Sequence, residues 1–250
     1  MEPENINGCG VLYVYNDVST KAQIATDMLH DTIMNFAQTS IFFHSIEKYH
    51  PSFYSEKSLA SLLLPSMAGD NRTYAVTAEY PIKRKRSKFS WVDYWVFCRR
   101  GLFLVETKHT WVNSGTGNFR KTAQDKWKKA IDQTDSVPRN EIWNDLKEHG
   151  HDVSTMDCYR VPLLIGVFID STKNEKMNWR ECWPDTTRKE KLVQGHKNMR
   201  KGLNPQPNWS ALWVLNENLE GPYDREKSGL GWIYPAVGFS AYVHIRSSKA

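Results

Sequence analysis

Three charged side chains, Asp93, Glu106 and Lys108, lie in a stretch of sequence that is otherwise mostly aromatic and aliphatic. This stretch, WVDYWVFCRRGLFLVETKHTW (residues 91–111), has a composition typical of strands inside a protein core. An isolated charge buried in such surroundings costs several kcal/mol unless it is paired or binds a metal ion. These residues are therefore the strongest candidates in the chain for a chemical role.

The stretch is predicted to form a hairpin of two strands, residues 91–98 and 102–109. Because side chains alternate across a strand, Glu106 and Lys108 are expected on one face, and Asp93 comes from the neighbouring strand. Apart from these charges, both faces of both strands are apolar, which is typical of strands in a sheet that is covered on both sides. The hairpin therefore brings two carboxylates and one ammonium group together.

The single ammonium group of Lys108 can neutralise only one of the two carboxylates. The remaining negative charge favours the binding of a divalent cation. Mg²⁺ (or Mn²⁺) prefers carboxylate and carbonyl oxygens together with water. We expect Asp93 and Glu106 to hold the metal, with the carbonyl of Thr107 as a further ligand. Lys108 would orient or deprotonate an attacking water and stabilise the charge of a pentacovalent phosphate. The alternative interpretation is a structural ion pair, in which Lys108 neutralises one of the two acids.

The pattern resembles the PD-(D/E)xK superfamily, the restriction-endonuclease-like nucleases. In that family an acid on one strand of the central hairpin is followed, on the next strand, by an acid and a lysine separated by one residue. Val92-Asp93 and Glu106-Thr107-Lys108 match this motif, and the latter is the only E-x-K in the chain. The proline that usually precedes the first acid is absent.

The resemblance covers roughly residues 50–170. It implies an α/β fold with a restriction-endonuclease-like core, in which a central mixed β-sheet is flanked by helices. We expect the whole chain, residues 1–250, to be a single domain. A helical segment (residues 1–49) would precede the core, and a C-terminal extension with a basic excursion (residues 171–208) would follow it.

Two further site residues are implied by the resemblance. Many members carry a Glu on the helix before the first core strand, and Glu56 occupies that place; Glu79, in the next predicted strand, is the alternative acid. A Gln on the helix after the E-x-K strand is also frequent in the family. Gln133 fits this position best, and Gln124, on another face of the same helix, is its rival.

Basic residues surround the hairpin in the sequence, in the run KRKRSK (residues 83–88), in the hairpin turn and at the start of the next helix. Runs of charge are usually solvated, but beside a nuclease centre they favour contact with phosphates. The expected nucleic-acid contacts are Lys85, Arg86, Arg99, Arg100 and Lys121.

The elements that must position these residues follow from apolar periodicity and from breakers. Helices are predicted over residues 17–49, with Asp17 and Ser19 as capping candidates, over 55–65, ending at Pro65, and over 119–137. Besides the hairpin, strands are predicted over residues 10–16, 73–82, 161–170 and 210–218, with one more in 232–246. Helices followed by three successive strands, a helix and another strand indicate an α/β domain with a mixed sheet.

The composition permits the chemistry that the hairpin suggests. The chain has a formal net charge of +5, which is compatible with a polyanionic partner. Its 4 cysteines are scattered singly, which argues against a disulfide framework or a zinc site. We expect no signal peptide, no transmembrane helix and no membrane partner, and therefore a cytoplasmic location.

The sequence therefore predicts a Mg²⁺-dependent endonuclease that hydrolyses phosphodiester bonds of nucleic acid, with DNA as the expected substrate. By resemblance, its setting would be restriction, phage (antiviral) defence or a mobile element. A homodimer or a partner protein would supply target choice. The alternative is a non-catalytic nucleic-acid-binding or assembly subunit that keeps the fold.

Overall fold

The computed structural model describes most of the 250-residue chain. The described residues are 3–47, 56–84, 87–98, 101–114, 121–148, 150, 156–172, 185–216, 223–224 and 231–247. The helices are η1 (Thr20–Ala22, a 3-10 turn), α1 (Gln23–Glu47), α2 (Glu56–Ala68), α3 (Lys121–Asp135), α4 (Arg139–Glu148) and α6 (Asp185–Gly202). The strands are β1 (Pro3–Ile6), β2 (Gly10–Asn16), β3 (Thr73–Arg84), β4 (Ser87–Cys98), β5 (Gly101–Asn113), β6 (Asp157–Thr172), β7 (Trp209–Leu215), β8 (Tyr223–Asp224), β9 (Gly231–Ala241) and β10 (His244–Ser247).

All of these strands belong to one mixed sheet. Its order is β1-β2-β7-β9-β6-β5-β4-β3, with β10 added to β6 and β8 added to β9. Strands β3, β4 and β5 form an antiparallel meander, whereas β6 is parallel to β5. The β5–β6 connection passes through α3 and α4, because parallel neighbours need a crossover. The expectation of an α/β domain with a mixed sheet flanked by helices is confirmed.

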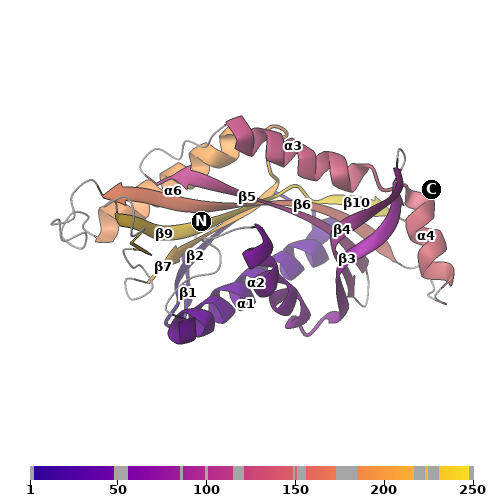
Figure 1. Ribbon diagram of the computed structural model, residues 1–250, viewed down its shortest axis with the longest axis horizontal. Helices are drawn as coiled ribbons and strands as arrows, with labels where there is room; N and C mark the ends of the chain where they lie inside the picture. The colour runs from indigo at the N-terminus through magenta and orange to yellow at the C-terminus, as the bar shows by residue number, and fades with distance from the viewer. Residues whose placement is uncertain are drawn as a thin grey trace.

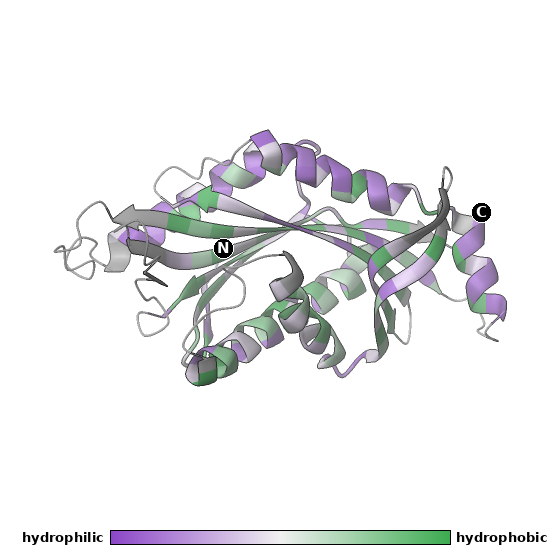
Figure 2. Cartoon of the chain, in the orientation of Figure 1, coloured by the Kyte–Doolittle hydropathy of each residue, from purple (hydrophilic) through white to green (hydrophobic). Residues whose placement is uncertain are grey.

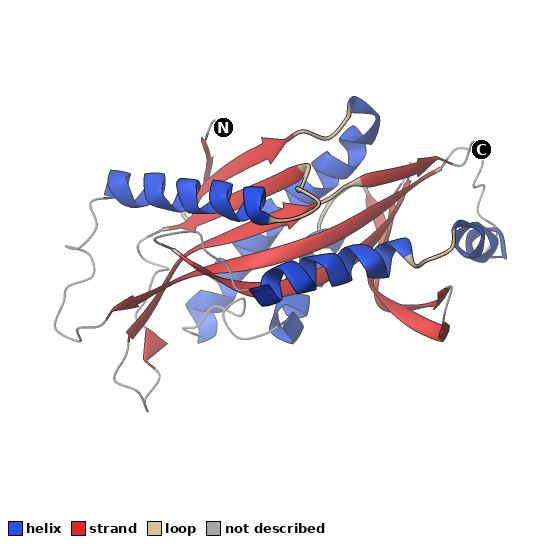
Figure 3. Ribbon diagram, turned by 90° about the horizontal axis from the view of Figure 1, so that it is seen from above, coloured by secondary structure: helices blue, strands red, loops and turns tan. Residues whose placement is uncertain are grey.

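Helices cover both faces of the sheet. Helices α1 and α2 lie against one face and α3 and α6 against the other, while α4 lies near the β3–β4 end (Figure 1). Seen from above, α3 and α6 occupy different parts of the same face (Figure 3). This two-sided cover explains why β5 and β6 are apolar on both faces.

The two helical layers differ in polarity. In Figure 2, α1 and α2 are largely green, whereas α3 and α4 are largely purple. Phe36 of α1 is fully buried and packs edge-on against Trp213 of β7 and Phe239 of β9. On the other face, Trp127 of α3 packs with Leu164 of β6 and donates its indole N–H to the Pro205 carbonyl at 2.9 Å.

Several boundaries differ from the predicted ones, most clearly in the first two helices. The first α-helix begins at Gln23 rather than at residue 17, and the side chain of Ser19 makes no capping hydrogen bond. Helix α2 continues beyond Pro65 to Ala68, because buried residues such as Met67 hold its last turn in the core. The loss of one backbone donor at proline is thus outweighed by packing.

The strands of the hairpin region are longer than predicted. The predicted strands end at residue 82 and begin again at residue 91, but β3 extends to Arg84 and β4 begins at Ser87, where these two residues pair. Strand β5 extends to Asn113, four residues beyond the predicted end at 109. Backbone hydrogen bonds to the neighbouring strand keep these added residues extended, although their sequence is more polar than that of the strand interiors.

The described part of the chain contains no helix long and apolar enough to span a membrane.

One buried titratable group has a consequence for stability. His196 of α6 is 2% exposed, and its Nε2 finds no hydrogen-bond partner among the described residues. Burial lowers the pKa of His196 to about 4, because its hydrogen bond to the Phe239 backbone only partly offsets desolvation. The folded protein therefore keeps this imidazole neutral.

His196 is expected to make the fold sensitive to mild acid. The unfolded chain protonates this group near pH 6.5 and the folded chain near pH 4, so stability is lost as the pH falls between these values. The loss is about 2–3 kcal/mol at pH 4.5, and His196→Leu should remove it. Urea unfolding of both proteins at pH 7.5 and 4.5 measures this difference. An equal loss in both proteins would show that His196 is not responsible.

Candidate functional site

The candidate site lies where strands β4 and β5 separate. Their ladder runs from the pair Cys98–Gly101 to the pair Tyr94–Val105. Beyond Val105, β5 continues to Asn113 with β6 as its only strand partner among the described residues. The edge of β5 that faces away from β6 is therefore open at the position where β4 carries its acid.

Asp93 replaces the missing strand partner of β5. Its Oδ2 accepts a hydrogen bond from the Thr107 backbone N–H at 2.7 Å and one from Thr107 Oγ1 at 3.0 Å. Its Oδ1 accepts none from a described residue, and the side chain is 32% exposed. One carboxylate oxygen thus binds both Thr107 donors, while the side chain as a whole keeps a partly exposed surface.

Lys108 points into this separation rather than toward solvent. Its Nζ lies 3.7 Å from Asp93 Oδ2 and donates to the Thr107 carbonyl at 2.7 Å, and its side chain is only 8% exposed. Burial of an ammonium group requires such partners. The carbonyl of Thr107, expected as a metal ligand, already accepts this hydrogen bond, so it would have only its second lone pair for a cation.

Glu106 supplies the second carboxylate. It is fully buried, two residues before Lys108 on β5, so both side chains leave the strand on the same face. Strand register also brings Asp93 to this position. Trp95 pairs with Leu104, and Asp93 and Glu106 each lie two residues further along their own strands in the same direction. Asp93, Glu106 and Lys108 therefore come from neighbouring positions of two adjacent strands.

The donor set fits a magnesium-type cation with few protein ligands. The described residues contain no group of three or more His, Cys, Asp or Glu side chains placed to hold a metal ion. Mg²⁺ commonly takes only one or two carboxylates and completes its shell with water and substrate phosphates. The partly exposed Asp93 and the buried Glu106 offer two carboxylates of this kind, one more than Lys108 can neutralise.

The two candidates for a further acid, Glu56 and Glu79, come from different elements, α2 and β3. Glu56 is the first residue of α2, and its side chain lies outside the described part of the structure. Glu79 falls between the pairs Ala78–Tyr94 and Tyr80–Val92, which places it across from Asp93 on β3. Its side chain is exposed, and its backbone has a φ of 52°, a left-handed conformation that is costly for a residue other than glycine.

The structure separates the two candidate glutamines. Gln124 is occupied elsewhere, because its amide exchanges two hydrogen bonds with the backbone of Asn204, at 2.7 and 3.1 Å. Gln133 is half-buried on α3 and lies seven residues, about two turns, from Lys126. Lys126 donates to the His109 carbonyl of β5 at 2.6 Å, so Gln133 lies on the side of α3 that faces β5.

The predicted nucleic-acid contacts fall mostly on segments without described structure. Lys121 is the exposed first residue of α3, the helix that packs against β5 and β6. The other predicted contacts, Lys85, Arg86, Arg99 and Arg100, lie outside the described residues.

Two features of the site were not anticipated. The sequence suggested a role only for the carbonyl of Thr107, yet its N–H and hydroxyl both bind Asp93. These contacts could have been predicted from the sequence, because a threonine occupies the middle position of E-x-K and the neighbouring strand carries Asp93. The contact of Lys126 with β5 had no such signal, because it depends on how α3 lies on the sheet.

Comparisons with family models, with curated proteins and with solved structures each returned no match for this chain.

Proposed function

We propose that this protein is a divalent-cation-dependent nuclease that hydrolyses phosphodiester bonds, with DNA as its substrate. The observation that carries the proposal is the convergence of Asp93 and Lys108 on Thr107, beside the buried Glu106, at the open edge of β5. A pair of carboxylates with one adjacent ammonium suits reactions in which negative charge develops on phosphate oxygens.

The arrangement of the surrounding elements supports the proposal. Helix α2, the meander β3-β4-β5, helix α3 and the parallel strand β6 occur in this order along the chain, with α4 as an additional helix before β6. This is the order of helix and strands expected from the resemblance to restriction-endonuclease-like nucleases. In this arrangement Asp93 of β4 and Glu106 of β5 each lie one residue beyond the last β4–β5 pair, Tyr94–Val105.

Each residue would have a separate role. Asp93 and Glu106 would hold Mg²⁺, which supplies positive charge for the phosphate and for the attacking water. Lys108 would donate hydrogen bonds to the water and to a non-bridging phosphate oxygen. The contact between Lys108 Nζ and the Thr107 carbonyl fixes the ammonium group in place, so little reorganisation is needed during the reaction.

A cleavage assay tests this proposal. The purified chain is incubated with supercoiled plasmid, single-stranded DNA and RNA, each with Mg²⁺, Mn²⁺, Ca²⁺ or EDTA. We expect nicking or degradation of DNA with Mg²⁺ or Mn²⁺ and none with EDTA. A Lys108→Met preparation, purified identically, controls for contaminating nucleases.

The same assay distinguishes the main alternative. Binding of nucleic acid without cleavage under every condition would contradict the nuclease proposal and favour a non-catalytic nucleic-acid-binding subunit. Cleavage of RNA alone would keep the chemistry and correct the substrate.

A further inference from the structure

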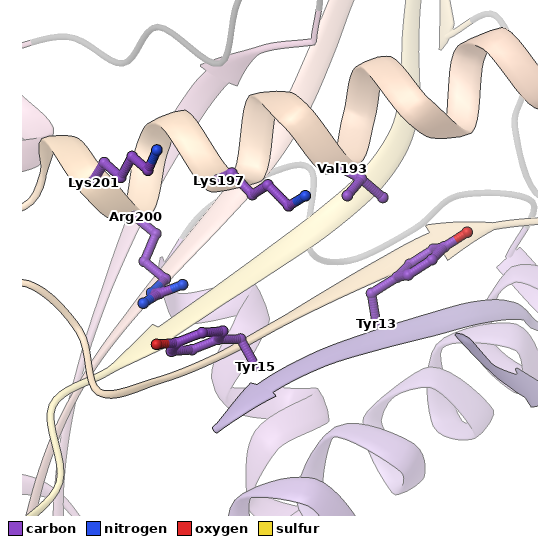
Figure 4. A pocket seen from close by; sticks show the side chains of 6 residues that line it. All are labelled: Tyr13, Tyr15, Val193, Lys197, Arg200 and Lys201. Carbon is purple, nitrogen blue, oxygen red and sulfur yellow. The ribbon is translucent and has the colours of Figure 1, made fainter. Parts of the chain in front are cut away.

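A pocket of about 340 Å³ lies between helix α6 and strand β2 (Figure 4). In the sheet, β2 is separated from β5 by β7, β9 and β6, so the pocket is roughly 20 Å from the candidate nuclease site. Its volume is at the lower end of the range for small-molecule sites. The lining consists of two aromatic residues of β2 and one apolar and three cationic residues of α6: Tyr13, Tyr15, Val193, Lys197, Arg200 and Lys201.

Arg200 is held in a fixed orientation. Its guanidinium carbon lies 3.1 Å from the centroid of the Tyr15 ring, and its Nε donates to the Pro207 carbonyl at 3.5 Å. Figure 4 shows the guanidinium directly beside the Tyr15 ring. Flat aromatic rings and guanidinium planes are the surfaces on which proteins stack nucleic-acid bases.

The pocket has an excess of positive charge. Lys197 and Lys201 are exposed and make no ion pair with any described residue, and no carboxylate contributes to the lining. Together with Arg200 they place three like charges around one small volume. An anion with several oxygens, such as a phosphate, would relieve their mutual repulsion.

The opposite end of the pocket is aromatic and apolar. Tyr13 is half-buried beside Val193, and its hydroxyl makes no hydrogen bond with a described residue. Tyr13 thus offers both a ring face and a free hydroxyl to a ligand. A cationic end and an aromatic end within about 340 Å³ match one phosphate and one base.

We propose that this pocket binds a nucleotide unit, with the phosphate at the cationic end formed by Lys197, Arg200 and Lys201 and the base against Tyr13 at the opposite end. The unit is either a free nucleotide or one nucleotide of a strand, since both present the same chemistry. This site is separate from the β4–β5 site and requires no divalent cation.

Binding experiments with the full chain in EDTA test the proposal. Equilibrium dialysis measures the dissociation constant of AMP, and fluorescence anisotropy measures that of a labelled hexathymidylate. Lys197→Ala/Lys201→Ala should weaken binding at least tenfold, and Tyr13→Leu should weaken it about tenfold through lost stacking. For the oligonucleotide, the double variant should also reduce the salt dependence by about 0.7 units of slope, the value for one phosphate contact on a single strand.

A matched control separates a pocket from a general charge effect. Lys189→Ala/Lys191→Ala removes the same charge from the same helix but from side chains that do not line the pocket. It should change either dissociation constant less than twofold. Binding of AMP identifies a free nucleotide, whereas binding of the hexathymidylate alone identifies a strand.

Three outcomes would overturn the proposal: equal losses in both double variants, inorganic phosphate competing as well as AMP, or no binding of either probe by the parent protein. The measurements are made in EDTA and can be repeated with Lys108→Met, so they do not depend on metal-dependent cleavage. Failure of the nuclease proposal would therefore not change their interpretation.

Discussion

Lys108→Met is expected to abolish DNA cleavage while leaving DNA affinity nearly unchanged. The Lys108 ammonium lies between the Thr107 carbonyl and Asp93 Oδ2, at 2.7 and 3.7 Å, where phosphate charge would develop. Loss of one such preorganised contact typically lowers the rate by about 10²–10³. Affinity would depend instead on the more numerous cations that we expect to contact the DNA backbone. Methionine retains an unbranched, buried side chain, so the strand should keep its packing.

Two measurements separate the effects of Lys108→Met. Single-turnover cleavage at saturating DNA with Mg²⁺ gives the rate, and anisotropy with Ca²⁺ gives the affinity. Lys126→Met is the matched control, because Lys126 also donates to a β5 carbonyl, that of His109 at 2.6 Å. We expect its rate at saturating DNA to stay within a few-fold of the parent. If Lys108→Met cleaves as fast as the parent, Lys108 is a structural ion-pair partner.

Asp93→Asn should abolish cleavage without unfolding the site. The asparagine oxygen can still accept the Thr107 N–H that Asp93 Oδ2 accepts at 2.7 Å, but it carries no charge for a cation or for Lys108. We expect a loss in rate of at least about 10², with a thermal midpoint within a few degrees of the parent. Asp93→Ala also leaves the Thr107 donors without their acceptor and should lose about 1–3 kcal/mol of stability.

A second acid provides the control for Asp93→Asn. Asp145 of α4 accepts a hydrogen bond from the Tyr80 hydroxyl at 2.7 Å and comes from a different element than Asp93. Asp145→Asn makes the same chemical change and should cleave like the parent. Equal rates for Asp93→Asn and the parent would contradict a role for Asp93 in the reaction.

The hairpin and its charges could be predicted because they depend on short-range rules. Alternation along a strand places Glu106 and Lys108 on one face, and apolar neighbours indicate burial on both sides. The structure places these charges as expected: Lys108 is 7% exposed and Glu106 is fully buried. Apart from α4, the order of helices and strands from α2 to β6 followed from the same periodicity.

Other features could not be predicted because they depend on how distant segments pack. Nothing near Gln124 in the sequence indicates its bonds to Asn204, which lies 80 residues away. Helix α4 was missed because it is short and mostly polar, and Ile142 and Leu146 gain their burial from β4 and β5. Likewise, β9 and β10 are divided at Val243, where Asn208 from another segment bonds both its N–H and its carbonyl.

The measurement that tests the central claim most directly is a Mn²⁺ titration of the protein bound to duplex DNA, followed by electron paramagnetic resonance of free Mn²⁺. If Asp93 and Glu106 form a cation site, the parent complex will bind about one or two Mn²⁺ ions per chain, as in other metal-dependent sites. Added Mg²⁺ will displace these ions. Asp93→Asn will lose this binding, and Asp145→Asn will keep it. Mn²⁺ binding that is absent from the parent complex, or identical in Asp93→Asn, would contradict the account and leave Asp93, Glu106 and Lys108 as a structural ion-pair network.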